Sequence, residues 1–371
     1  MAASQDRAHP GTPFFSTGVF PLRPLLTILK RILLSAFAIL ALFALGAGWV
    51  WLSTRQEEVA FQSGNITIRG TLLSPRFGSG APGVVLVHGS GQTSRKSTML
   101  YAWIFASQRY AALAYDKRGV GKSEGGSNEW SAFSLDDLAS DAAAGYRFLQ
   151  SRKGVDPKRV GFFGASQGGW VVSLAANRVD MPAFVVMVSA SVSTVAEDRL
   201  YGREAEIRHA GFGSDAVGQG IELMRLDHQV TRSGQGYEQL LAAADRYHVA
   251  EWFRAINPGL ETPLPADAPH RIWERKVLDF DPQPLLGTLT SPVLWVFGDP
   301  ALDRFSPVRL SLSRVEQAKA SGMPYDTIQI GNVGHTLELE GGRSIQTLVQ
   351  VRLPLIRKMF RWLDVHAKGR G

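Results

Sequence analysis

Residues 160–170 read Val-Gly-Phe-Phe-Gly-Ala-Ser-Gln-Gly-Gly-Trp, and the interpretation of the whole chain starts from them. An apolar run ends in Gly-x-Ser-x-Gly, and small and apolar residues follow. A serine on a tight turn from strand to helix projects its hydroxyl away from the backbone, and crowding there requires glycine two residues before and after it. The stretch predicts that Ser166 is a nucleophile, although a plain glycine-rich turn would also contain these five residues.

Composition limits the size of the fold and excludes several kinds of site. A chain of 371 residues with 45% hydrophobic and 20% charged residues forms one large domain with an insertion, or two domains. Because it has no cysteine, disulfides, thiolate metal sites and a cysteine nucleophile are excluded. Of the net charge of +7, residues 1–55 contribute +4. No basic stripe interleaved with aromatic residues is present, so we expect no nucleic-acid partner.

An apolar run near the N-terminus predicts a membrane anchor. Residues 32–52 contain 21 residues without a charge, which is long enough to cross a bilayer as a helix. Lys30 and Arg31 precede the run, so the positive-inside rule places the N-terminus in the cytoplasm and the main domain in the periplasm or extracellular space. We expect a disordered cytoplasmic tail over residues 1–24 and a transmembrane signal-anchor helix over residues 25–53. A cleavable signal peptide is the alternative.

Alternating strands and helices after this run predict an α/β fold. Two alternating segments around a turn at Ser63-Gly64-Asn65 are typical of an antiparallel hairpin. Further apolar runs end at glycine-rich or polar loops, as buried central strands do. These strands are expected at residues 83–87, 111–116, 159–165, 183–188, 292–298 and 327–330. The pattern favours a mostly parallel eight-stranded sheet with helices on both faces and right-handed crossovers.

Residues 193–290 interrupt this alternation, because they carry no strong strand signal. They are interpreted as helices broken by Gly and Pro, inserted as a cap over the carboxyl ends of the strands. The core is then divided into residues 56–192 and 291–371. We expect the cap to determine which substrate is bound.

A serine hydroxyl is a poor nucleophile at neutral pH, so it requires a base and an acid that orients the base. His335 lies in a loop after a late predicted strand, and Asp303 lies in the loop after the preceding strand. In open α/β sheets, functional loops follow the carboxyl ends of strands. Asp299 in the same loop is the alternative acid. Both aspartates stay candidates for the acid at this point.

Five motifs in this order resemble those of the α/β-hydrolase fold enzymes, in particular bacterial esterases, serine aminopeptidases and prolyl-oligopeptidase-type catalytic domains. The motifs are His88-Gly89-Ser90-Gly91, residues 116–123, residues 164–168, the Asp303 loop and residues 332–335. The resemblance implies a catalytic triad of Ser166, His335 and Asp303. It also implies an oxyanion hole formed by the backbone N–H groups of Gln167 and Ser90, with Gly89 as the alternative to Ser90.

Other candidate sites are given structural interpretations. Residues 119–123 resemble the end of a phosphate-binding loop, but Asp116 stands where that motif requires glycine. His88 is expected to shape its loop, and Arg95 is expected to be solvated. No histidine pair has the spacing of zinc ligands beside carboxylates, so we expect neither a metal nor a cofactor.

These features predict a membrane-anchored serine hydrolase that cleaves carboxylic ester bonds through an acyl-enzyme. Its substrate is expected to be a small-molecule ester or a short acyl or peptide compound. The substrate's identity and the oligomeric state stay open. A peptidase-like amide hydrolase of the same fold is the first alternative, and a catalytically silent ligand-binding protein is the second. An ester is favoured because no acidic residue can be assigned to an amine-binding site.

Overall fold

The protein is described by a computed structural model that covers residues 30–31, 33–34, 37, 41, 45–46, 48–125, 133–256, 262–339 and 344–367. It divides into two units, Met1–Leu52 and Ser53–Gly371. The described residues of the first unit are helical. Within the described parts of the chain, no helix is long and apolar enough to cross a membrane. The predicted tail over residues 1–24 and much of the predicted anchor over residues 25–53 lie outside the described residues, so both stay predictions.

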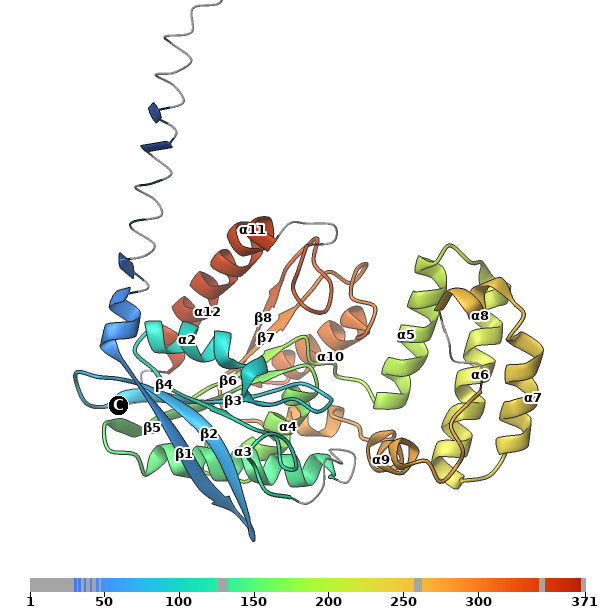
Figure 1. Ribbon diagram of the computed structural model, residues 1–371, viewed down its shortest axis with the longest axis horizontal. Helices are drawn as coiled ribbons and strands as arrows, with labels where there is room; N and C mark the ends of the chain where they lie inside the picture. The colour runs from blue at the N-terminus through green and yellow to red at the C-terminus, as the bar shows by residue number, and fades with distance from the viewer. Residues whose placement is uncertain are drawn as a thin grey trace, which may run out of the picture. The chain divides into compact units, whose positions relative to one another are not determined.

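An eight-stranded sheet runs through the second unit, in the order β1-β2-β4-β3-β5-β6-β7-β8 (Figure 1). The strands are β1 (Thr54–Ser63), β2 (Ile66–Pro75), β3 (Ala81–Val87), β4 (Ala111–Tyr115), β5 (Val155–Ala165), β6 (Val185–Val188), β7 (Val293–Phe297) and β8 (Tyr325–Gln329). The pairs β1–β2 and β2–β4 are antiparallel, and the other pairs are parallel. The predicted α/β fold with a mostly parallel eight-stranded sheet is therefore confirmed.

The register of the parallel strands brings their carboxyl ends to one edge of the sheet. Val87 of β3 is opposite Gly164 of β5, and Val188 of β6 is opposite Val296 of β7. The central strands are buried on both faces, which explains their continuous apolar runs. The loops that follow β3, β5, β6, β7 and β8 consequently emerge beside one another.

Helices cover both faces of the sheet (Figure 1). One face packs against α2 (Met99–Ser107) and α12 (Leu353–His366). The other face packs against α3 (Leu135–Gln150), α4 (Gln167–Ala176) and α10 (Val308–Ala320). Shorter helical segments are η1 (Arg95–Ser97), η3 (Gln283–Gly287), α11 (Ser344–Thr347) and η4 (Leu348–Arg352). Helix α3 is capped by Ser134, whose hydroxyl accepts from the backbone N–H of Asp137 in a capping box.

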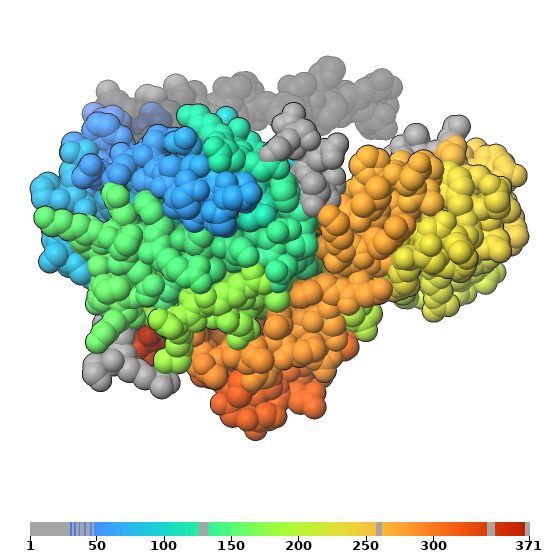
Figure 2. Space-filling view, turned by 90° about the horizontal axis from the view of Figure 1, so that it is seen from below, coloured from blue at the N-terminus to red at the C-terminus, as the bar shows by residue number. Residues whose placement is uncertain are grey.

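Five helices lie between β6 and β7, in the region that the sequence assigns to the cap. They are α5 (Val195–His209), α6 (Ser214–Ser233), α7 (Tyr237–Tyr247), α8 (Glu251–Ile256) and α9 (Pro269–Val277). Apolar side chains of α5 to α8 form a small separate core that includes Ile207, Val217 and Trp252. Figure 2 shows α6 and α7, in yellow, projecting beside the sheet domain. The cap therefore has a core of its own, while the start of α5 and helix α9 also pack against the core of the sheet.

We predict that Gly164, two residues before Ser166, is required for the full stability of the fold. A Cβ atom at Gly164 would lie 2.3 Å from the backbone oxygen of Gly168, and neither backbone can move without disrupting β5 or α4. We expect Gly164→Ala to lower the free energy of unfolding by more than about 2 kcal/mol, as overpacking of a rigid site does. Urea denaturation of the full chain measures it. The control is Gly287→Ala, because a Cβ at Gly287 has no atom within 4 Å. Equal stability of the two variants would contradict the prediction.

Candidate active site

Ser166 occupies the sharp turn between β5 and α4. Its backbone has φ 53° and ψ −124°, a conformation that non-glycine residues adopt rarely and at a cost in free energy. The turn is held because the Ser166 N–H donates to the carbonyl of Val188 at 2.8 Å. A Cβ atom at Gly168 would lie 2.4 Å from the carbonyl oxygen of Val87, so glycine is required there too. The turn presents the serine hydroxyl at the carboxyl edge of the sheet.

The structure brings Ser166, His335 and Asp303 together from three loops. Nε2 of His335 lies 3.1 Å from Oγ of Ser166, and Nδ1 lies 3.2 and 3.1 Å from the two carboxylate oxygens of Asp303. Because a carboxylate only accepts, Nδ1 carries the hydrogen, and the lone pair of Nε2 faces the serine hydroxyl. This arrangement allows the imidazole to accept the serine proton.

Backbone amides fix the carboxylate of Asp303. The N–H groups of Phe305 and Ser306 each donate to Oδ1 of Asp303 at 3.0 Å, and the side chain is buried. The ring of Phe305 also packs against the imidazole of His335, with the centroids 5.3 Å apart. From the loop after β6, the Ser189 hydroxyl donates to the carbonyl of His335 at 2.7 Å. Ser189 was not identified from the sequence, because no motif marks it.

Asp299 has a different position from Asp303. Its carboxylate accepts from the backbone N–H of Ala301 at 2.9 Å and from that of Asn332 at 3.0 Å. These two hydrogen bonds lower the pKa of Asp299. Asp299 thus joins the loop after β7 to the loop after β8, while Asp303 contacts the imidazole.

The two residues predicted to supply the oxyanion donors lie on either side of Ser166. Gln167 is the first residue of α4, and the first N–H groups of a helix have no acceptor within the helix. The loop at residues 88–91 lies against the turn, because a Cβ at Gly89 would be 3.5 Å from Cβ of Ser166. Backbone N–H groups at Ser90 and Gln167 are therefore within the two segments that border the serine.

Lys117 lies behind this loop, and sequence reasoning did not single it out. Its ammonium group donates to the carbonyls of Gly89 and Gly91 and to the side-chain oxygen of Gln167. Burial lowers the pKa of Lys117 to about 8. The signal that could have identified it is a lysine two residues after the end of a buried apolar strand, where a charge requires partners.

Arg95 is buried, so the expectation that it is solvated is wrong. Its guanidinium donates to both carboxylate oxygens of Asp116 at 3.2 and 3.1 Å, and to Glu58 at 2.9 Å. Although burial acts to raise the pKa of Asp116, the hydrogen bonds from Arg95 and from the backbone N–H of Lys122 hold it below its usual value. A Cβ at Gly121 would lie 2.7 Å from the Asp116 carboxylate, so residues 119–123 wrap around a carboxylate, not around a phosphate.

His88 is buried beside β4. Nε2 of its ring lies 3.1 Å from the carbonyl oxygen of Tyr115, so Nε2 carries the hydrogen. Burial, with the charge of Lys117, lowers the pKa of His88 to about 3, and the ring is neutral at physiological pH. His88 therefore supports the loop as a neutral packed ring, as expected from the sequence.

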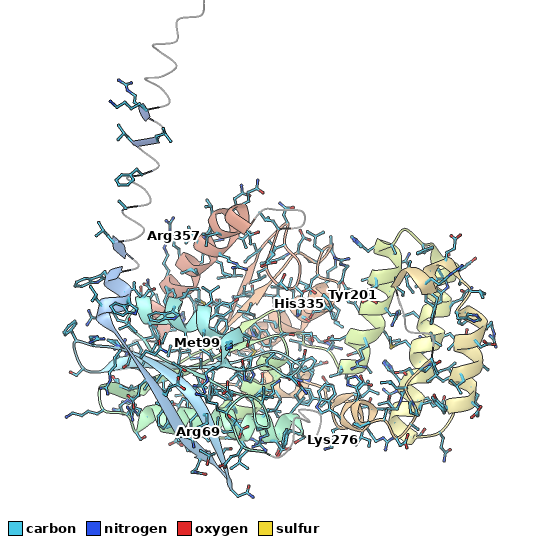
Figure 3. All side chains as sticks on the ribbon, viewed as in Figure 1. Arg69, Met99, Tyr201, Lys276, His335 and Arg357 are labelled. Carbon is cyan, nitrogen blue, oxygen red and sulfur yellow. The ribbon has the colours of Figure 1, made fainter. Side chains whose placement is uncertain are left out.

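Helix α5 of the cap contacts the triad loops directly. The hydroxyl of Tyr201 donates to the carbonyl of Asp303 at 3.0 Å, and Figure 3 shows Tyr201 and His335 where α5 faces the sheet domain. A pocket of about 220 Å³ lies at this junction. Its lining includes Asp198, Arg199, Arg203, Arg304 and Phe305. Among the described residues, no group of three or more His, Cys, Asp or Glu side chains is placed to hold a metal ion.

Asp198 is a half-buried carboxylate in the lining of this pocket. Burial raises the pKa of Asp198 to about 7. The hydroxyls of Ser191 and Ser193 each donate to one of its two oxygens. Both oxygens are thus already hydrogen-bonded within the protein.

Comparison with known sequences gives two matches. A family model described as "Alpha/beta hydrolase family" matches residues 84–343. The chain is also 31% identical over 121 residues to the quorum-quenching protein AidA of Acinetobacter baumannii (strain MDR-ZJ06). That match covers 32% of this chain and 39% of the relative, so the chain spans well under half of the relative's length.

Solved structures share the fold at low sequence identity. An esterase of Pyrococcus furiosus is 14% identical with a TM-score of 0.53, and the match covers 85% of this chain and 92% of that one. The proline iminopeptidase of Mycobacterium smegmatis is 16% identical with a TM-score of 0.52, covering 84% and 99%. At such identities the likeness shows the fold and leaves the substrate open.

The two loop aspartates can be distinguished by substitution. We expect Asp303→Asn to lower the rate of ester hydrolysis by on the order of 10⁴-fold, because the amide favours the wrong imidazole tautomer. Asp299→Asn is the matched control, since its side chain bonds backbone amides. It should lower the rate by less than about 10-fold. Initial rates on p-nitrophenyl acetate measure both. The reverse order of effects would assign the role to Asp299.

Proposed function

The chain belongs to the alpha/beta hydrolase family, as its motifs predict, and on that premise we propose that it is a serine hydrolase that cleaves carboxylic ester bonds. One observation carries the proposal: Nε2 of His335 lies 3.1 Å from Oγ of Ser166 while Asp303 binds the other ring nitrogen. This is the geometry that activates a serine for attack on a carbonyl carbon.

The reaction then proceeds in two halves. Oγ of Ser166 attacks the ester carbonyl as Nε2 of His335 takes its proton, and the imidazolium passes that proton to the departing alkoxide. Water then attacks the acyl-enzyme as the same nitrogen takes its proton, and the imidazolium returns that proton to Oγ of Ser166 when the acyl–oxygen bond breaks and the acid leaves. Asp303 holds the tautomer and stabilises the imidazolium. The proposed steps use side chains, backbone and water alone.

The oxyanion of each tetrahedral intermediate is assigned to the N–H groups of Ser90 and Gln167. One such donor lowers the barrier by roughly 3–4 kcal/mol, because it is oriented before charge develops. The positive end of α4, which begins at Gln167, adds to this effect.

The charges beside the triad support an ester over a peptide with a free amino end. The adjoining pocket contains three arginines and the acidic residues Asp198 and Glu206. Both oxygens of Asp198 accept from serine hydroxyls and Glu206 pairs with Arg203, so both carboxylates of this lining are already engaged. A substrate ammonium would have to displace a partner, whereas an uncharged ester would not. The similarity to a protein named for quorum quenching supports a small-molecule substrate.

We also propose that the enzyme is anchored in a membrane with its N-terminus in the cytoplasm and its catalytic domain outside it. The support is the uncharged run over residues 32–52 after Lys30 and Arg31.

Labelling with a fluorophosphonate probe tests the proposed nucleophile. We expect the full chain to be labelled and Ser166→Ala to be unlabelled, because the probe reacts with activated serines. Ser151→Ala is the matched control, since Ser151 is exposed at the end of α3. Undiminished labelling of Ser166→Ala would contradict the assignment. A folded wild-type protein that is never labelled and hydrolyses no ester would favour the ligand-binding alternative.

A further inference from the structure

We propose that Lys117 is a positioning residue for this reaction, because its buried ammonium group holds together the two backbone segments that carry the oxyanion donors. The inference rests on the proposed function, since it concerns the same oxyanion hole. It assigns a role to a side chain that never touches the substrate.

The contacts of Lys117 use all of its donors. Its side chain is buried, and Nζ lies 2.9 Å from the carbonyl oxygen of Gly89, 3.1 Å from that of Gly91 and 3.2 Å from Oε1 of Gln167. An ammonium group has three N–H donors, and three acceptors surround it. Loss of the group would leave the buried acceptor of Gln167 and the half-buried carbonyls of Gly89 and Gly91 without this donor, and an unpaired buried acceptor costs more than its bond contributes.

The first contact orients the Ser90 donor through the geometry of the peptide bond. The described residues contain no cis peptide. In a planar trans peptide, the carbonyl of Gly89 and the N–H of Ser90 point in opposite directions within one plane. When Lys117 holds that carbonyl from one side, the N–H of Ser90 is directed to the other side. The bond to Gly91 fixes the next part of the same loop.

The third contact reaches the opposite half of the oxyanion hole. Gln167 supplies the second backbone donor, and its buried side chain ends on the same ammonium group. The loop after β3 and the first residue of α4 are 78 positions apart when counted from Gly89 to Gln167. Lys117 therefore sets the distance between two donors that the chain itself does not connect closely.

The charged neighbours of Lys117 in the chain are each paired with another residue. Asp116 is bonded to Arg95, and Arg118 donates to the two oxygens of Asp141 at 2.7 and 2.6 Å. These two pairs fix the backbone on either side of Lys117. Of these three consecutive ionisable residues, Lys117 is the one directed to the oxyanion loop.

The protonation of Lys117 offers a signature that a purely structural lysine would lack. Burial lowers its pKa to about 8. The ionisable group facing it from the loop after β3 is His88, which is neutral because its pKa is lowered to about 3. From α4 it faces the uncharged Gln167, and its neighbours Asp116 and Arg118 are paired. Above its pKa Lys117 loses its charge and one donor, so oxyanion stabilisation should weaken with rising pH.

The test is the rate of Ser166 labelling by a fluorophosphonate, measured on the full chain between about pH 6 and pH 10. We expect the wild-type rate to decline on the alkaline side around the pKa of Lys117. Lys117→Met should be labelled about 10–100-fold more slowly at neutral pH and should lack this decline. With p-nitrophenyl acetate, kcat should fall by the same factor while KM stays within about 3-fold, because the lost interaction belongs to the transition state.

Lys122→Met is the matched control, since Lys122 lies in the same loop with an exposed side chain. It should keep both the wild-type rate and the alkaline decline. Gln167→Glu gives a second test that tolerates partial loss of activity. A carboxylate within hydrogen-bonding distance of Nζ stabilises the ammonium, so the decline should move to higher pH by about one unit or more.

Any one of three results would overturn the inference. The first is a wild-type labelling rate in Lys117→Met, and the second is an alkaline decline of the rate that this substitution leaves unchanged. The third is a decline whose pH does not move in Gln167→Glu. If Lys117→Met does not fold, the pH profiles of the labelling rate for the wild type and Gln167→Glu decide whether the inference holds. Wild-type protein that is folded but unlabelled would overturn the proposed function and this inference together.

Discussion

The turn at Ser166 can form because glycine stands two residues before and two residues after it. With no side chains at Gly164 and Gly168, the start of α4 approaches the end of β3 closely enough for their backbones to touch. That approach places the loop at residues 88–91 beside the serine hydroxyl. The imidazole, the acid and the donors then come from loops whose positions follow from the strand register. Side chains at the two glycine positions would push the turn away from the loop at residues 88–91 and so separate the serine from these groups.

Much of this arrangement was predictable because its signals are local. Apolar runs of strand length identified the sheet, and the order of Ser166, Asp303 and His335 placed each at a strand end. The choice between Asp303 and Asp299 depended on how one loop folds, and spacing alone could not decide it. The anchor over residues 25–53 is still a prediction.

The residues that sequence reasoning missed share a cause. Lys117 binds Gln167, which is 50 positions away, and Arg95 binds Glu58, which is 37 positions away. A charged side chain in a loop has the same local pattern whether it faces water or a buried partner brought by the fold. Such residues become visible only when the tertiary structure supplies the partner, and here two of them support the loop beside the nucleophile.

The hydroxyl of Tyr201 joins the cap to the carbonyl of Asp303, the residue that orients the imidazole. Any displacement of α5 is therefore transmitted to the acid loop, and the cap is not an interchangeable module. Exchange of this insertion for one from a relative would change more than substrate choice, because the new cap must also present a donor at the same carbonyl. Within the cap, α5 carries this link to the acid loop, whereas α6 and α7 pack against the cap's own core.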